Sequence, residues 1–449
     1  MLDPSFFPGW LRITHLVNII FLSFLIRSGL QILSAFPRLY WTDNCRPGIE
    51  WVKFTRSHVP REDPQQLYER YVSQRENKPP ESANAQARRP RNHLASVLVW
   101  CLAGMGYLGF MVVGAQSRKQ GRLDGVAAPL LVSTVLAAST ASALLTAPQP
   151  PPRIYTSLEE ERDISPWLGL PGHKQLGLGR HWHFFTDVFW ILNGLAFWVL
   201  VIIFGQWRYL VPTSWSIIPA AWQSIVAYLT FHLAPNLPGQ PFDAVQKLSY
   251  FFIIFLLAPF QILTGAAMSP SISARFPWYI KLFGGRQAAR SLHFLSLIVF
   301  VLFVIVHTFM VIIHGLGKEL ALITFGQDSN RVLAIVIAVL VLGALVGLHV
   351  AATRISLDHP RGTQRVLGSL LSRVVAVLLS REKSRQEYPR ERISSYFWVN
   401  GHPPVDPAFQ ALADGEFAGW RLEVGGLVER QLCLSLAELR AMPKQTQIT

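Results

Sequence analysis

The sequence predicts an all-α transmembrane helix bundle, with a core of four helices and additional spans, followed by a short C-terminal β-rich soluble fragment. Three observations predict it. Apolar residues make up 51% of the 449 residues and charged residues only 15%, against a usual charged share of about 25%. Several apolar runs reach the roughly 20 residues that a helix needs to cross a bilayer. The stretch 394–449 instead alternates apolar and polar side chains, as strands do.

The charge and the cysteines exclude several classes of protein. The formal net charge is +14, which in a soluble protein would suggest nucleic acid. Here the basic residues lie between apolar runs, so we expect lipid headgroups as their partners and no nucleic acid. Cys45, Cys101 and Cys433 are too few and too scattered for a zinc site, an iron–sulfur cluster or a disulfide framework.

Five apolar runs are long enough to span the membrane: 13–36, 184–205, 246–268, 291–315 and 332–352. The first is too long for a signal peptide, contains Arg27 and lacks a small-residue cleavage site after it. Two weaker runs at 95–116 and 126–147 predict a transmembrane hairpin. The stretch 215–233 mixes Trp, Ile and Phe with Ser, Gln and His, which is typical of an interfacial amphipathic helix.

These runs divide the chain into five parts. Residues 1–36 form the first span of the bundle, and residues 37–152 form a polar, basic insertion that contains the possible hairpin 95–147. Residues 153–352 hold the rest of the bundle. We expect a linker at 353–393 and a separate soluble fragment at 394–449.

Two histidines on one apolar run carry the functional argument, because ionisable residues inside a bilayer are costly. His293 and His307 are 14 residues apart, which is about 21 Å along a helix and returns to the same face. One lies near each edge of the hydrocarbon, which is the arrangement that two stacked haem irons require. The alternative is a pair of buried histidines that only form hydrogen bonds with neighbouring helices.

Arginine precedes histidine by three residues at the start of three runs. The pairs are Arg12–His15, Arg180–His183 and Arg290–His293. An arginine one turn from the histidine, toward the water, pairs well with a haem propionate. Each arginine could equally extend its charge to a lipid headgroup. Arg27, about 18 Å along the helix from His15, is a further candidate for the propionates of the second haem.

The number of crossings assigns the histidines to opposite faces of the membrane. His183 and His293 fall on one face, and His15 and His307 on the other, which gives two bis-histidine pairs. His181 is an alternative to His183. His314, at the membrane edge, could bond to a quinone or a propionate, or simply lie at the interface.

These motifs resemble the di-haem b-type cytochrome subunits of formate dehydrogenases and nickel–iron hydrogenases. The resemblance rests on the Arg-x-x-His motifs at the start of three apolar runs and on the helix with the His-x13-His motif. It covers residues 8–36 and 180–352. It implies four helices that hold two haem b groups in the cell (inner) membrane, and electron transfer between the quinone pool and an attached redox module. The implied iron ligands are His15, His183, His293 and His307. The insertion at 61–152 departs from the family.

The C-terminal fragment resembles the start of a sulfite-oxidase-type molybdopterin domain. The motifs are W-R-L-x-V-x-G-L-V from Trp420 and L-S-L-A-E-L-R-x-M-P from Leu434. Such a domain binds molybdenum through a cysteine beyond this point, and Cys433 does not match its position. We therefore expect a molybdopterin oxidoreductase domain or subunit as a partner, and a complete molybdopterin site only in a longer chain. We expect no complete catalytic site within these residues.

Two other classes of protein remain open. A haem-free transporter would use the same intramembrane His and Arg residues, and a membrane anchor would only hold a soluble partner. The orientation is also open. Arg and Lys residues at 269–290 and after 352 place the C-terminal fragment in the cytoplasm, whereas the resembling cytochromes imply the opposite.

Overall fold

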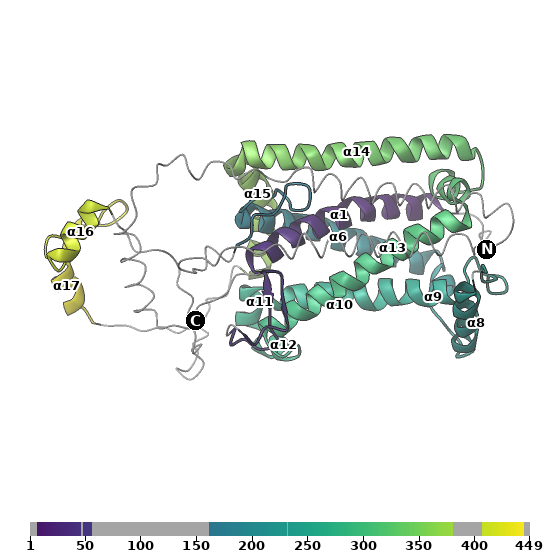
Figure 1. Cartoon of the computed structure of the whole chain (residues 1–449), viewed down its shortest axis with the longest axis horizontal. Coiled ribbons are helices and arrows are strands. Elements are labelled where there is room, and N and C mark those ends of the chain that lie inside the picture. The colour runs from purple at the N-terminus through teal and green to yellow at the C-terminus, as the bar shows by residue number, and fades with distance from the viewer. Residues whose placement is uncertain (1–6, 46–47, 56–160, 231, 380–405, 444–449) are drawn as a thin grey trace.

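The computed structural model describes residues 7–45, 48–55, 161–230, 232–379 and 406–443. Among these residues, five helical segments are long and apolar enough to cross a membrane. They are α1 (Gly9–Ala35), α6 (Leu176–Ile203), the third span Ala244–Ala267, α13 (Arg286–Phe325) and α14 (Arg331–Asp358). The prediction of an all-α transmembrane bundle is confirmed (Figure 1). The runs 95–116 and 126–147 lie outside the described residues.

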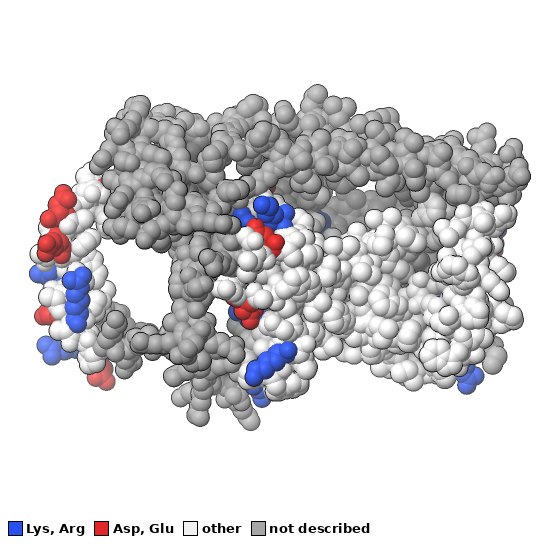
Figure 2. All heavy atoms as spheres, turned by 60° about the horizontal axis from the view of Figure 1, so that its bottom comes forward, with Lys and Arg blue, Asp and Glu red and all other residues white. Residues whose placement is uncertain are grey.

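The outer surface of the bundle is apolar, as lipid contact requires. On α14, Val339 and Leu340 have 63% and 67% of their surface exposed. The bundle face in Figure 2 carries its Lys, Arg, Asp and Glu residues near the two ends and none along the middle. This distribution fits a hydrocarbon band between two polar edges.

The third span is built from three consecutive helical segments. They are α9 (Ala244–Phe251), a π-helical turn at Phe252–Leu257 and α10 (Ala258–Ala267). Pro259, which has no N–H to donate, is the second residue of α10 and lies just after the π-helical turn. The wider turn contributes Ile253 and Leu257 to the buried core.

A short helix crosses the direction of the spans near the start of α9. Helix α8 (Ile217–Leu229) has 13 residues, about 20 Å, which is too short to span a bilayer. Figure 1 shows it at a steep angle to the spans, as the sequence predicts for an interfacial helix. Its Tyr228 hydroxyl donates to Asp243, the N-cap of α9, at 2.5 Å. Burial and this carboxylate raise the pKa of Tyr228.

A hairpin follows α1 and closes one end of the bundle. Strands β1 (Arg38–Leu39) and β2 (Val52–Lys53) pair antiparallel. Arg38 and Glu50 form a buried ion pair at 2.6 Å. Burial opposes ionisation of Glu50, but backbone N–H groups and Arg38 outweigh it, so the pKa of Glu50 is lowered. Trp51 donates its indole N–H to Ser291 at 2.8 Å, which fixes the hairpin against α13.

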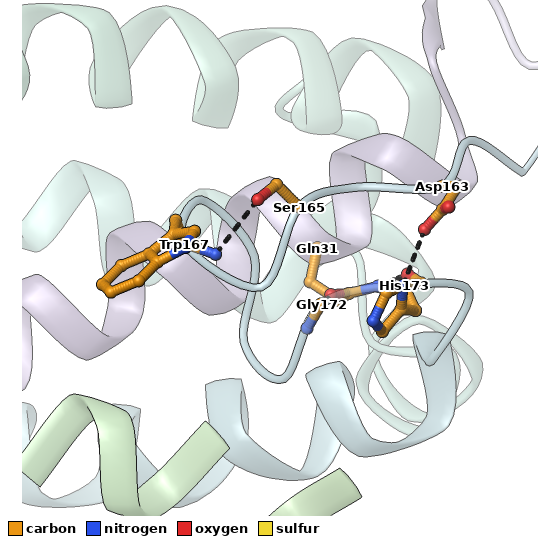
Figure 3. Close-up of polar contacts among 6 residues, drawn as sticks. All are labelled: Gln31, Asp163, Ser165, Trp167, Gly172 and His173. Carbon is orange, nitrogen blue, oxygen red and sulfur yellow. Dashed lines mark hydrogen bonds and ion pairs between the residues drawn. The ribbon is translucent and has the colours of Figure 1, made fainter. Parts of the chain in front are cut away.

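Gln31 of α1 holds the loop that leads into α6 (Figure 3). It is fully buried, donates to the His173 carbonyl at 2.7 Å and accepts from the Gly172 N–H at 2.8 Å. His173 and Asp163 pair at 3.1 Å and close the loop. Gln31 therefore satisfies two backbone groups of this loop, the Gly172 N–H and the His173 carbonyl.

Gly179 of α6 should be intolerant of a side chain because Gln31 packs directly on it. An added Cβ would lie 2.5 Å from Gln31 Cγ, whereas at Gly177 it would meet nothing within 4 Å. We expect Gly179→Ala to destabilise the protein by about 1–3 kcal/mol through overpacking, and Gly177→Ala to be neutral or slightly stabilising. Thermal unfolding of the two variants in detergent would check this. Equal melting temperatures would contradict the packing.

The segment after the last span differs from the expected linker. Residues 353–358 complete α14, and α15 (Pro360–Leu379) packs against α6 and α14. Further along, α16 (Pro407–Asp414) precedes an antiparallel hairpin of β3 (Arg421–Val424) and β4 (Leu432–Ser435), then α17 (Leu436–Ala441). The expected strands in the C-terminal fragment are present, although two short helices accompany them.

Candidate functional site

Four histidines meet in two pairs, one toward each end of the bundle. The ring centres of His15 on α1 and His307 on α13 are 6.4 Å apart. The ring centres of His183 on α6 and His293 on α13 are also 6.4 Å apart. The structure thus brings together the same pairs that the crossing count predicts, although their ligation of iron stays a prediction.

An aromatic core lies along α13 between the two pairs. Phe300 is seven residues from His293 and seven from His307, so it lies about halfway between them. It packs edge-on against Trp190 of α6, with ring centres 6.2 Å apart. Trp190 and Phe300 belong to one buried cluster with Ile253 and Leu257. The region between the histidine pairs is therefore apolar and closely packed.

Arg180 and Arg290 lie at the His183–His293 end, and both are close to the ring of Phe36. Their guanidinium carbons are 5.5 and 5.6 Å from the centre of the Phe36 ring. Arg290 also donates to the carbonyls of Arg38 and Phe36. Arg180 is exposed and makes no hydrogen bond or ion pair among the described residues. Of the two, Arg180 is the freer to bind an anion.

Arg12 and Arg27 are engaged with the protein itself. Arg12 donates to the Thr324 carbonyl at 2.6 Å. Arg27 donates to His349 at 2.8 Å and to three oxygens at 2.5–2.9 Å. The expected propionate contacts of Arg12 and Arg27 therefore compete with these partners and stay predictions.

His181, the alternative ligand, and His314, the candidate partner of a quinone or a propionate, lie elsewhere. His181 bonds to the Gly177 carbonyl at 2.8 Å and lies against α15, where a Cβ on Gly368 would be 3.6 Å from its ring. His314 bonds to the Met310 carbonyl of its own helix at 2.9 Å. Gly315, with φ 117° and ψ 89°, bends α13 directly after it. The ring-to-ring geometry favours His183 over His181 as the partner of His293.

Sequence reasoning missed a polar chain between α1 and α14. Arg27 donates to His349 Nδ1, so the ring proton of neutral His349 is on Nε2, 2.9 Å from Ser23 Oγ. The Ser23 hydroxyl in turn donates to the Ile20 carbonyl at 2.7 Å. His349 ends the last apolar run and gave no pattern with another histidine. An intramembrane arginine one helical turn from a serine was the only available signal.

Asp187 was also missed. It is half-buried on α6, one turn after His183, and makes no hydrogen bond or ion pair among the described residues. A carboxylate within a span is itself a signal of function.

In the part of the chain that the structure describes, no group of three or more His, Cys, Asp or Glu side chains is arranged to hold a metal ion. Each histidine pair instead offers two imidazoles, with ring centres 6.4 Å apart, which suits a group that needs only two protein ligands. A haem has this property because its porphyrin supplies the other four ligands.

Comparison with known proteins gives a match to one family model. Residues 129–326, less than half of the chain, match the family described as "Prokaryotic cytochrome b561". The match includes His183, His293 and His307 but not α1, which carries His15. No curated protein and no solved structure matched the chain.

The fold and this match define the class as a multi-pass integral protein of the cell membrane. More particularly, the matched region is similar to membrane cytochromes b, a class of protein that binds haem b and takes part in electron transfer.

Proposed function

We propose that this chain is a di-haem b-type cytochrome that passes electrons between the quinone pool and a molybdopterin-dependent oxidoreductase module. His15 and His307 would hold one haem, and His183 and His293 the other. Each bound haem would supply a one-electron iron couple. The fragment at 394–449 would be the contact with the molybdopterin module.

The observation that carries this proposal is the 6.4 Å between ring centres in both pairs. A metal–imidazole bond of about 2 Å, with roughly 1 Å more to each ring centre, gives about 6 Å between two rings that share one metal ion. Direct hydrogen bonding between the rings would need a shorter separation. The spacing therefore favours two axial ligands over a simple buried pair.

The remaining residues would fill the space between the two haems and balance the charge of a propionate. Trp190 and Phe300 would fill the space between the two haems and exclude water from it. Arg180, whose guanidinium makes no hydrogen bond or ion pair among the described residues, would pair with a propionate of the His183–His293 haem. Bis-histidine ligation would leave no open position on iron, which suits electron transfer better than oxygen chemistry.

Reduction by quinol tests this function directly. In proteoliposomes that contain the full chain, a soluble quinol should reduce the bound haem, seen as a rising α band. Preparations that hold haem but are not reduced by quinol would contradict the quinone part of the proposal. Preparations without haem would contradict all of it and favour a transporter or an anchor.

A further inference from the structure

The two histidine pairs differ in how their rings are held. His183 Nδ1 lies 3.0 Å from Ser28 Oγ on α1. The Ser28 hydroxyl already donates to the Phe24 carbonyl at 2.8 Å, so its oxygen accepts from His183. His183 also forms a hydrogen bond with the backbone of Leu25. The proton of this ring is therefore on Nδ1, and Nε2 keeps its lone pair.

His293 is held in the same way from α10. Its Nδ1 lies 3.1 Å from the Gln261 carbonyl and 3.1 Å from Thr264 Oγ1. The Thr264 hydroxyl donates to the Phe260 carbonyl at 2.9 Å. A carbonyl can only accept, so Nδ1 carries the proton here too. Nε2 accepts from the Gln261 side chain at 3.0 Å, as expected of an unprotonated nitrogen.

One sequence spacing produces both arrangements. A backbone carbonyl at one position, a hydroxyl three residues later and a glycine directly after it occur on both helices. The two sets are Leu25, Ser28, Gly29 and Gln261, Thr264, Gly265.

The two sets also pack alike. Ser28 and Thr264 are both fully buried, so water does not compete for the ring proton. A Cβ added at Gly29 or Gly265 would lie 3.7 or 3.4 Å from the carbon Cε1 of the facing imidazole. The glycines thus let each helix approach the ring that its hydroxyl holds.

The His15–His307 pair has no such support. Among the described residues, neither ring forms a hydrogen bond. Aromatic rings flank His307 instead, with Phe303 at 5.5 Å and Tyr250 at 6.1 Å between ring centres. The two sites therefore differ chemically, although their ring spacing is the same.

We propose that the Ser28–Gly29 and Thr264–Gly265 pairs are positioning elements that lower the midpoint potential of the His183–His293 haem. This inference rests on the proposed di-haem function. Donation from Nδ1 to a carbonyl or hydroxyl fixes the ring orientation and makes Nε2 a stronger base. A more basic axial ligand stabilises the oxidised iron, which lowers the potential. The His15–His307 haem lacks this effect.

The test is a redox titration of the full chain, followed by visible absorbance. In the double variant Ser28→Ala with Thr264→Ala, we expect two haems per chain and a rise in the midpoint potential of one of them. The expected size is about tenfold in the redox equilibrium constant, or about 59 mV for one electron. The potential of the other haem should not change.

Single variants separate the contributions of the Ser28 and Thr264 hydroxyls. Thr264→Ala and Ser28→Ala should each shift the potential less than the double variant, because the hydroxyl on the other helix still accepts from its histidine. Thr264→Ser keeps the hydroxyl and should keep the native potential. If the double variant loses a haem, Ser28→Ala alone provides the test.

A matched control is Ser296→Ala, because Ser296 is a buried serine of α13 whose hydroxyl donates to the Leu292 carbonyl. It should leave both potentials unchanged. Unshifted potentials in Ser28→Ala and in the double variant, with both haems bound, would overturn the inference but leave the di-haem function intact. Absence of haem from the native protein would instead contradict the proposed function itself.

Discussion

His307→Ala is expected to remove one haem and leave the other in place. His307 faces only His15 among the four candidate ligands, whereas His183 and His293 face each other at the opposite end of the bundle. Each haem needs both of its axial histidines to stay bound, so His15 alone would not retain it. The α-band absorbance and the extracted haem per chain should therefore fall by about half.

Two further variants make this result decisive. His15→Ala and the double variant of His15 and His307 should each lose the same single haem, because residues that act as one unit are not additive. The control is His314→Ala, seven residues along α13, which should retain both haems. Loss of a haem in His314→Ala, or retention of two in His307→Ala, would contradict the pairing.

Arg27→Ala is expected to give the largest loss of stability. Arg27 donates to His349 and to the carbonyls of Pro166 and Gly169 within the bundle. The variant would leave these acceptors without donors, at a cost of about 3 kcal/mol or more. The melting temperature in detergent should fall clearly, with both haems still bound below it.

The control for Arg27 is Arg354→Ala, which removes the same charge from an exposed position on α14. It should have little effect on the melting temperature. An unchanged melting temperature in Arg27→Ala, with a shifted haem potential, would contradict the structural role and support the propionate contact.

The sequence predicted those features of the fold and the site that depend on a regular pattern along a single helix. The five spans follow from the length of the apolar runs. His293 and His307 share one face of their helix because they are 14 residues apart and the helix has 3.6 residues per turn. The direction of each crossing then identified the partner on α1 or α6. These steps need no knowledge of side-chain packing.

Contacts between helices distant in the sequence were not predictable in this way. The link from Arg27 to His349 joins residues 322 positions apart, and no periodicity relates them. Gln31 reads as an ordinary polar residue in α1 until the loop before α6 folds onto it. Helix α15 was not predicted although its sequence is amphipathic, and its packing on α6, which no sequence period indicates, stabilises it.

The central claim is that the two histidine pairs each hold one haem b. The most direct measurement is a dithionite-reduced minus oxidised visible spectrum of the purified full chain, with haem quantified per chain. We expect a sharp b-type α band and about two haems per chain. A preparation from cells supplied with haem that shows no such band would contradict the claim.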